Sequence, residues 1–368
     1  MQIWKIIPTF AIYNGIILKC DNMVLYESSL PIASPEKSRV AAGTNLLAVD
    51  IGGTKTDLAL YEIQDQDFVL LKDKVYESKD WKDFADIVRD FTKSAPATPQ
   101  RMSIAAAGPV RDSKVKLTNL KWSLDSTALK EELDLESVSL INDLEANAYG
   151  LAVLNEADLQ LVYAGKADQA GNAAIIAPGT GLGEGGLYWD GALFHPFATE
   201  GGHTDFSPRT GQDIALLRYL QAQFGHVSWE RIVSGPGIYN IYQFLRDVEK
   251  KEEPDWLREK ISKNDPAQII GEHIKEAAIC KESIHLFIKY LAIEAANLAL
   301  KLKATGGLFI GGGIPPKIWN ETLQTLFLEH FFQMGRMRPL LEMMPVQLIL
   351  NAKTALLGAA YYGSYGDK

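Results

Sequence analysis

The sequence predicts an α/β protein made of two similar halves with a cleft between them. One pattern occurs twice: an apolar strand, a glycine-rich turn and a second strand, at residues 46–61 and again at residues 173–189. Further strands and amphipathic helices follow each copy. The chain has 368 residues, 47% of them hydrophobic, which is enough for two domains. A repeat after about 130 residues, a common domain length, favours a duplication.

The first of these hairpins combines features that suit phosphate and a metal ion. Residues 46–49 form an apolar strand that ends at Asp50, and the turn Ile51-Gly52-Gly53-Thr54 leads into a second strand. Glycines let another group approach the backbone closely, and exposed N–H groups at such a turn attract anions. Asp50 would hold a hydrated cation beside those anions. An ordinary hairpin shows the same pattern. The turn is no Walker A loop, because no Gly-Lys-Ser/Thr follows it.

The order of the predicted elements suggests three parts. We expect an N-terminal extension over residues 1–44, a small α/β domain over residues 45–150 plus 350–368, and a large α/β domain over residues 151–349. Apolar spacing predicts helices over residues 80–92, 126–133, 211–224, 234–249, 265–278, 281–302, 317–332 and 353–362. Asp80 is the expected N-cap of the first helix, and the last helix is expected to cross back to the small domain. The charged run over residues 250–253 is expected to be solvated.

Asp143 is the candidate for proton transfer. Residues 138–141 predict a buried strand that stops at Asn142-Asp143, where a helix begins at once. Open α/β sheets bind their ligands at this end of their strands. Because Asn and Asp are also preferred N-caps, Asp143 could instead simply cap the helix.

Three glycine turns each follow a buried strand: Gly52-Gly53, Gly179-Thr180-Gly181 and Gly311-Gly312-Gly313. Such turns could hold the phosphates and the nucleoside of a nucleotide, with Asp143 as the isolated carboxylate between them. Phosphoryl transfer requires charge neutralisation, in-line positioning and a carboxylate that takes the proton of the acceptor hydroxyl. The residues therefore favour a phosphotransferase.

Composition excludes several other classes of protein. The formal net charge is −9, and an acidic chain without long basic clusters is a poor binder of nucleic acid or anionic membranes. The two cysteines, Cys20 and Cys280, cannot form a disulfide framework, which favours the cytoplasm. The apolar N-terminus is interrupted by Pro8, Asn14 and Gly15 and is too short to span a membrane.

Six ordered motifs resemble one known family. They are DIGGTKTDLAL from Asp50, LINDLEANAYGL from Leu140, PGTGLG from Pro178, EGGHTDF from Glu200, ERIVSGPG from Glu230 and GGLFIGGG from Gly306. The chain from about residue 46 to residue 363 resembles the bacterial glucokinases, sugar kinases of the actin–hexokinase superfamily. The resemblance implies a two-domain actin-like ATPase (ribonuclease H-like) fold with duplicated βββαβα units and a cleft between them. It also implies ATP-dependent phosphorylation of D-glucose at the 6-hydroxyl, with Mg²⁺.

The resemblance implies a role for each matching residue. Asp143 is the base that takes the proton of the sugar 6-hydroxyl, and Asp50 acts through Mg²⁺. The sugar-binding residues are Asn119, Asn142, Asp143, Glu200, His203 and Glu230. The residues expected to bind ATP are Asp50, Gly52, Gly53, Thr54, Lys55, Gly179, Thr180, Gly181, Gly311 and Gly312. The family implies a homodimer in the cytoplasm, with no nucleic-acid or membrane partner.

Several alternatives stay open at this point. His203 is expected to bind sugar, although a structural histidine or a zinc ligand would also fit Glu200-x-x-His203; a cysteine-rich zinc motif of related proteins is absent from the sequence. Glu184, next to the second glycine turn, receives no role. The substrate could be another hexose, such as mannose or N-acetylmannosamine, and the phosphoryl donor could be polyphosphate. A sugar sensor or regulator on the same fold is a further alternative.

Overall fold

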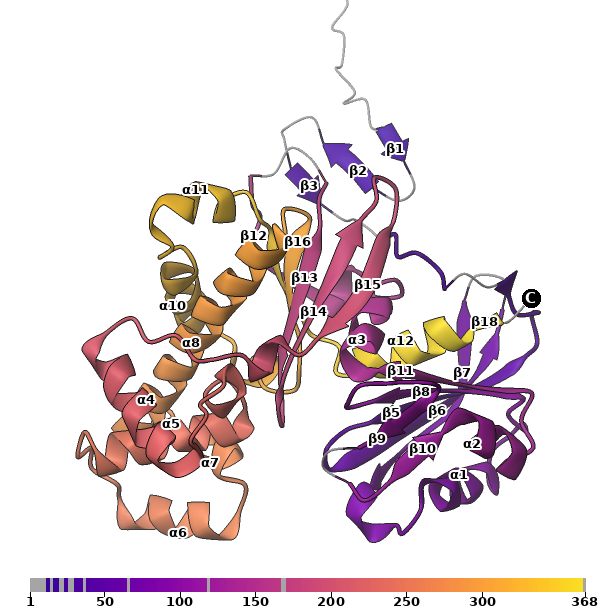
Figure 1. Ribbon diagram of the computed structural model, residues 1–368, viewed down its shortest axis with the longest axis horizontal. Helices are drawn as coiled ribbons and strands as arrows, with labels where there is room; N and C mark the ends of the chain where they lie inside the picture. Colours follow the sequence, from indigo (N-terminus) through magenta and orange to yellow (C-terminus); the bar gives the residue numbers. More distant parts are fainter. Residues whose placement is uncertain are drawn as a thin grey trace, which may run out of the picture.

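The computed structural model describes residues 30–366 apart from 36–37, 65–66, 118–119 and 167–169, and three short strands within the first 29 residues. Two separate sheets, each flanked by helices, make up the body of the molecule (Figure 1). We call the five-stranded sheet with its helices the small lobe and the six-stranded sheet with its helices the large lobe. The domain boundaries and the cleft expected from the sequence stay predictions.

The small-lobe sheet has the strand order β11-β8-β5-β6-β7. Its strands are β5 (Asn45–Ile51), β6 (Lys55–Ile63), β7 (Phe68–Glu77), β8 (Arg101–Ala106) and β11 (Ser137–Asn142). Strands β5, β6 and β7 form an antiparallel meander, and β8 and β11 run parallel to β5. The central strand β5 is apolar over residues 46–49 because both its faces are covered there: Leu47 and Val49 pack with α1, whereas Leu46 and Ala48 belong to the core between the lobes.

Shorter elements complete the small lobe. The outer face is covered by α1 (Phe84–Thr92) and α2 (Ser126–Glu132), and β9 (Lys114–Lys116) pairs with β10 (Ser123–Asp125). The sequence placed the start of α1 wrongly. Asp83, not Asp80, caps this helix by accepting from the Ala85 N–H, and Asp80 ends the 3₁₀ turn η1 (Ser78–Asp80). Trp81 lies outside the helix and packs on Tyr76, with ring centres 5.5 Å apart.

The large-lobe sheet repeats the same order of strands, which confirms the duplication. Its strands are β12 (Leu159–Tyr163), β13 (Ala173–Pro178), β14 (Leu182–Trp189), β15 (Phe194–Thr199), β16 (Gly307–Ile310) and β17 (Val346–Ile349). A meander of β13, β14 and β15 is followed by parallel β16 and β17, just as β5, β6 and β7 are followed by β8 and β11. Strand β12 is added antiparallel at the edge. Each unit ends with a further strand and helix beyond the predicted βββαβα.

The last helix of each unit packs on the sheet of the other lobe. Helix α3 (Asp143–Gly150) follows β11 but contacts β14 and β15, whereas α12 (Thr354–Gly363) follows β17 but lies on β5 and β8 (Figure 1). The two helices cross so closely that a Cβ at Gly150 would clash with Thr354 and a Cβ at Gly358 with the Ala146 carbonyl. The predicted return of the last helix to the small lobe is therefore confirmed.

The remaining helices lie in the large lobe. They are α4 (Gly211–Phe224), α5 (Gly235–Asp247), α6 (Asp255–Lys263), α7 (Pro266–Glu272), α8 (Ala278–Leu302), α9 (Pro315–Ile318), α10 (Glu321–Phe331) and α11 (Arg338–Leu341). Short 3₁₀ turns are η2 (Glu156–Asp158), η3 (Gly201–His203), η4 (Trp229–Arg231) and η5 (Gly335–Met337). Among the described helices, α8 alone is long and apolar enough to cross a membrane, but 78% of that stretch is buried in the protein. It is the core helix of the large lobe.

Three large-lobe helices differ from the prediction. The helix expected over residues 317–332 is split into α9 and α10, because the Asn320 side chain accepts from the Leu323 N–H and starts a new helix. The helix expected over residues 265–278 ends at Glu272. Helix α6 was not anticipated.

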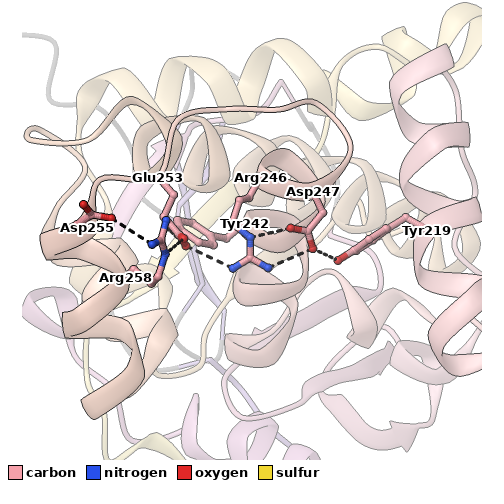
Figure 2. Close-up of polar contacts among 7 residues, drawn as sticks. All are labelled: Tyr219, Tyr242, Arg246, Asp247, Glu253, Asp255 and Arg258. Atoms are coloured by element: carbon pink, nitrogen blue, oxygen red, sulfur yellow. Dashed lines mark hydrogen bonds and ion pairs between the residues drawn. The ribbon is translucent and has the colours of Figure 1, made fainter.

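The charged run at residues 250–253 is not fully solvated, which corrects the prediction. The Glu253 side chain is only 6% exposed and accepts hydrogen bonds from Tyr242 (2.9 Å), Arg246 (3.3 Å) and Arg258 (2.6 Å). Arg246 also donates to Asp247, which accepts from Tyr219 as well (Figure 2). These contacts join α4, α5 and α6, and the two arginines supply the positive charge that a buried carboxylate needs.

The segment before β5 spans both lobes. Three short antiparallel strands, β1 (Ala11–Tyr13), β2 (Ile16–Lys19) and β3 (Met23–Leu25), form a sheet of their own. Leu30 donates its N–H to the Leu151 carbonyl, and Phe194 on β15 donates to the Pro31 carbonyl. Strand β4 (Ser38–Arg39) then pairs with β18 (Tyr365–Gly366) after α12. We call residues 30–39 the N-terminal strap.

We predict that the N-terminal strap stabilises the whole body. Ile32 is 5% exposed, and Ile32→Ala should lower the free energy of unfolding by roughly 2–4 kcal/mol, because it leaves a cavity in the core between the lobes. Val75→Ala, at a side chain 52% exposed, is the matched control and should change it by less than about 0.5 kcal/mol. Urea-induced unfolding measures both variants. Equal midpoints for Ile32→Ala and the unmodified chain would show that the strap contributes nothing.

Candidate active site

The start of α3 sets the position of Asp143. The Asn142 side-chain oxygen accepts from the N–H groups of Leu144 (2.9 Å) and Glu145 (3.3 Å), so Asn142 is the N-cap and Asp143 is the first helical residue. The alternative that Asp143 simply caps the helix is therefore wrong. The Asn142 amide nitrogen donates to the Gly108 carbonyl at 3.2 Å, which leaves one amide hydrogen for a ligand.

Sheet register brings Asp50 and Asp143 together across the small lobe. Ile51 on β5 and Asn142 on β11 are both paired with Ala106 on the intervening strand β8. Since these three strands are parallel, their carboxyl ends meet at one edge of the sheet. Asp50 and Asp143 are close enough there for the charge of Asp143 to act on Asp50.

Both carboxyls bind protons more tightly than usual. Burial raises the pKa of Asp50 to about 7, and the charges of Asp143 and then Asp57 add to the effect. Burial is also the main cause that raises the pKa of Asp143, with a smaller contribution from the charge of Glu200, while the Leu144 N–H lowers it. A base whose pKa lies nearer to neutrality is better matched to a proton transfer at physiological pH.

Two carboxylates and a histidine from the large lobe lie together, and one of them, Glu200, is close enough for its charge to act on Asp143. Glu200 precedes η3, His203 ends it, and Glu230 lies on η4. The His203 ring nitrogens are 3.9 Å from the Glu200 Oε2 and the Glu230 Oε1, which is too far for hydrogen bonds. Glu230 Oε2 accepts from the Leu182 N–H at 3.0 Å and is thereby oriented. The His203 side chain is 61% exposed, so it is not a packed structural histidine, and its nitrogens are free to meet a ligand.

The second and third glycine turns lie next to each other. Gly312 has φ of +80° and approaches the Pro178 carbonyl so closely that a Cβ would clash with it. The Gly313 nitrogen would be 4.0 Å from a Cβ on Gly179. The Gly235 N–H at the start of α5 donates to the Gly179 carbonyl at 2.8 Å. The sequence did not assign Gly235 to the site, although the ERIVSGPG motif with its Ser234 cap pointed to this helix start.

The first glycine turn closes the β5–β6 hairpin. The Gly52 N–H donates to the Lys55 carbonyl (2.9 Å), and the Thr54 carbonyl accepts from the Ser78 N–H (2.9 Å). The Lys55 side chain is 60% exposed and faces Glu77 on β7 at 3.7 Å. Asn119 lies outside the described residues.

The residues present suit a divalent cation held partly by its substrate. Among the described residues there is no group of three or more His, Cys, Asp and Glu side chains that could hold a metal. Mg²⁺ commonly takes only one or two carboxylates and completes its shell with water and phosphate oxygens. Asp50 and Asp143 raise the local negative charge, and a cation beside Asp50 would relieve it.

Together these groups form a continuous site. It runs from Asp50 and Asp143 through Glu200, His203 and Glu230 to the paired glycine turns. Carboxylates can accept hydrogen bonds from the hydroxyls of a neutral polyol, whereas backbone N–H groups at glycine turns can donate to phosphates. Fold and site define a two-lobed phosphotransferase of the actin-like ATPase class.

Comparisons with known proteins identify the family within this class. The family model described as Glucokinase matches residues 47–365. The glucokinases of Nostoc sp. (strain PCC 7120) and Synechocystis sp. (strain PCC 6803) are 42% and 38% identical over 86% and 87% of this chain and 98% of their own length. The chain belongs to the glucokinase family.

Solved structures agree with the fold. A glucokinase from an Antarctic psychrotroph is 32% identical, with a TM-score of 0.72 over 87% of this chain and 98% of that one. Glucokinase from Balamuthia mandrillaris, solved with glucose, has a TM-score of 0.74 over 88% and 94% of the two chains at 21% identity. A ROK family glucokinase from Streptomyces griseus, solved with glucose and AMPPNP, has a TM-score of 0.59 over 86% and 98% at 19% identity. The last two likenesses concern the fold alone.

We predict that Asp50 lowers the stability of the unliganded protein above neutral pH. Its pKa, about 7 in the folded chain against 3.8 normally, means that the folded state loses this proton less readily than the unfolded state. The loss of unfolding free energy caused by Asp50 therefore grows as pH rises from about 4 to 7 and stays constant above pH 7. Asp50→Asn should remove the cost and stabilise the protein by roughly 1–3 kcal/mol at pH 8, with little change at pH 4.

Thermal unfolding without Mg²⁺ or nucleotide, at a series of pH values, measures this effect. Asp67→Asn, at an exposed carboxyl of the same lobe, is the matched control and should show no pH-dependent gain. Destabilisation of Asp50→Asn at pH 8 would contradict the prediction.

Proposed function

We propose that this chain transfers the γ-phosphoryl group of ATP to the 6-hydroxyl of D-glucose, giving glucose 6-phosphate and ADP. The observation that carries the proposal is the position of Asp143. It follows the Asn142 cap at the start of the helix between the lobes, close to both Asp50 and Glu200. Membership of the glucokinase family supports the same activity.

Asp143 acts as the general base. Its carboxylate accepts the proton of the 6-hydroxyl while that oxygen bonds to the γ-phosphorus and the bond to the ADP oxygen breaks. The Leu144 N–H, 3.0 Å from Asp143 Oδ1, fixes one carboxylate oxygen and leaves the other for the sugar. A general base of this kind contributes about 10²–10⁴ in rate.

Sugar hydroxyls are bound by the large-lobe carboxylates. Glu200 and Glu230 accept from the hydroxyls, and the His203 ring between them offers one donor and one acceptor. Asn142 donates through its remaining amide hydrogen, and Asn119 closes over the sugar. Once bound sugar and lobe closure bury these groups, all of them must be paired, so such a site rejects analogues that lack a hydroxyl.

The glycine turns bind the nucleotide. Gly52, Gly53 and Thr54 hold phosphate from the small lobe, and Gly179, Thr180 and Gly181 hold it from the large lobe. Gly311 and Gly312 flank the adenosine, and Lys55 is the remaining residue that we expect to bind ATP. Mg²⁺ held by Asp50 neutralises the phosphates when bound. Closure of the lobes around the sugar would exclude water and suppress ATP hydrolysis.

The assembly and its place in the cell are part of the proposal. We propose a homodimer in the cytoplasm, without nucleic-acid or membrane partners. The free thiol of Cys280 is buried in α8, and burial raises its pKa to about 12, so it is an unreactive core residue.

We predict that Asp143→Asn lowers kcat about 10²–10⁴-fold while glucose binding survives. The helix should remain intact, because Asn142 is the cap. Steady-state kinetics and glucose titration by calorimetry measure the two effects. Glu200→Gln is the contrasting variant, and it should raise the KM for glucose more than the KM for ATP. Near-normal kcat for Asp143→Asn would show that another group is the base.

We predict that glucose is the preferred acceptor among hexoses. A coupled assay of ADP release should give kcat/KM at least about tenfold higher for D-glucose than for D-mannose or N-acetyl-D-mannosamine. In the same assay, 6-deoxyglucose should give no ADP, because it lacks the acceptor hydroxyl, and polyphosphate should not replace ATP. Preference for another hexose would change the assigned substrate. Absence of sugar-stimulated ADP release together with salt-sensitive DNA binding would favour a regulator instead.

A further inference from the structure

Glu184 is a buried carboxyl that the proposed mechanism does not use. It lies on β14, two residues after Leu182 at the end of the second glycine turn, and its side chain is 1% exposed. Neither carboxyl oxygen accepts a hydrogen bond from a described residue. An ionised carboxylate without partners is very costly inside a protein. The side chain is therefore expected to be neutral at physiological pH.

The sugar-binding loop lies directly on this carboxyl. A Cβ at Gly201 would clash with Glu184 Oε2, so the loop backbone contacts the carboxyl. Thr199 Oγ1 donates to the Glu184 carbonyl at 2.9 Å, and the Gly201 N–H donates to Thr199 Oγ1 at 3.2 Å. Gly201 is flanked by Glu200 and lies within the same 3₁₀ turn as His203. A change in the charge of Glu184 thus acts on the backbone between Glu200 and His203, two residues proposed to bind sugar.

The charged groups that face Glu184 come from α8. Burial is the main cause that raises the pKa of Glu184, the charge of Glu294 raises it further, and Lys301 lowers it. Burial raises the pKa of Glu294 as well, whereas hydrogen bonds from Asn297 (2.8 Å) and Lys301 (3.5 Å) and the charge of Arg209 favour its ionised form. Because Glu294 accepts these two hydrogen bonds and Glu184 accepts none from the described residues, we assign the proton of the pair to Glu184, which can donate it to Glu294.

We propose that Glu184 is a positioning residue for sugar binding: its protonated carboxyl supports the Glu200–His203 loop, and loss of that proton displaces the loop and weakens the binding of glucose. This inference rests on the proposed function. Ionisation would place a second negative charge beside Glu294 and against the backbone at Gly201, and Lys301 is the one described cation whose charge acts on Glu184 to offset it. The lost proton would also leave Glu184 and Glu294 as two acceptors without a shared donor.

The raised pKa of Glu184 sets the pH range in which glucose binding should weaken. Burial and the Glu294 charge raise its pKa to about 8, so it is largely protonated at pH 7 and largely ionised at pH 9. If the ionised form does not bind sugar, the Kd for glucose should rise about tenfold between pH 7 and pH 9. The Kd for ATP should change less, because Glu184 contacts the sugar loop.

Calorimetric titration with glucose from pH 6.5 to 9.5 tests the proposal. Glu184→Gln keeps the size and a donor for Glu294 but cannot ionise, so its Kd should match the unmodified chain at pH 7 and stay within about twofold up to pH 9. Glu259→Gln, at a side chain 68% exposed, is the matched control and should retain the tenfold rise. Glu294→Gln removes the neighbouring charge, so it should move the rise to lower pH. The same rise in Glu184→Gln, or none in the unmodified chain, would overturn the proposal.

Amide hydrogen exchange separates this proposal from the proposed function. Protection of residues 199–204 is compared between the unmodified chain and Glu184→Gln at each pH without sugar, which cancels the intrinsic pH effect on exchange. The unmodified chain should lose protection relative to Glu184→Gln above about pH 8. Should the chain bind no glucose at any pH, the proposed function would be wrong, and this comparison alone would decide whether Glu184 supports the loop. Equal protection at all pH values would reject that role.

Discussion

The exchange of helices between the lobes is the constraint on which the rest of the structure depends. Helix α3 leaves the small-lobe sheet and packs on the large-lobe sheet, α12 does the reverse, and the two cross where Gly150 and Gly358 leave room. One hydrophobic core, with residues from both sheets and the N-terminal strap, is the result. Because Asp143 starts α3, this packing fixes the proposed base between the two lobes. A side chain at either glycine would separate the helices and displace that residue.

Electrostatics gives the site its second constraint. Asp50, Asp143, Glu200 and Glu230 concentrate negative charge in a chain that is already acidic. Such a group is unfavourable in the unliganded protein, as the raised pKa of Asp50 and Asp143 indicates. Binding of a cation and a polyol relieves this destabilisation, because both pair with carboxylates, and the clustered charge therefore favours binding. Glu184, against the loop of Glu200 and His203, has its pKa raised as well, and in its protonated form it adds no further negative charge to the site.

Local sequence patterns predicted most elements but not their ends. The strand–glycine turn–strand hairpins and the core stripe of α8 follow from apolar spacing, and the structure has them where expected. The predicted start of α1 was wrong by several residues because both Asp80 and Asp83 are good caps; in the structure Asp83 caps the helix, and Trp81 packs on Tyr76 before it begins. Glu253 was taken as solvated because nothing local shows that Arg246 and Arg258 surround it.

The sequence by itself determined the duplicated α/β plan, the three glycine turns and Asp143 as a carboxylate at a strand end, because these depend on residues close together in the chain. Only the tertiary structure decided that Asn142 is the cap and that Asp50 lies near Asp143. It also decided that the second and third turns adjoin and that Glu184 is buried beneath the loop of Glu200. The Asn142 cap is a local contact, but Asn and Asp are both good caps, so the sequence could not choose between Asn142 and Asp143. The contacts between Asp50 and Asp143 and between the second and third turns join residues roughly a hundred positions apart, and no local pattern encodes them.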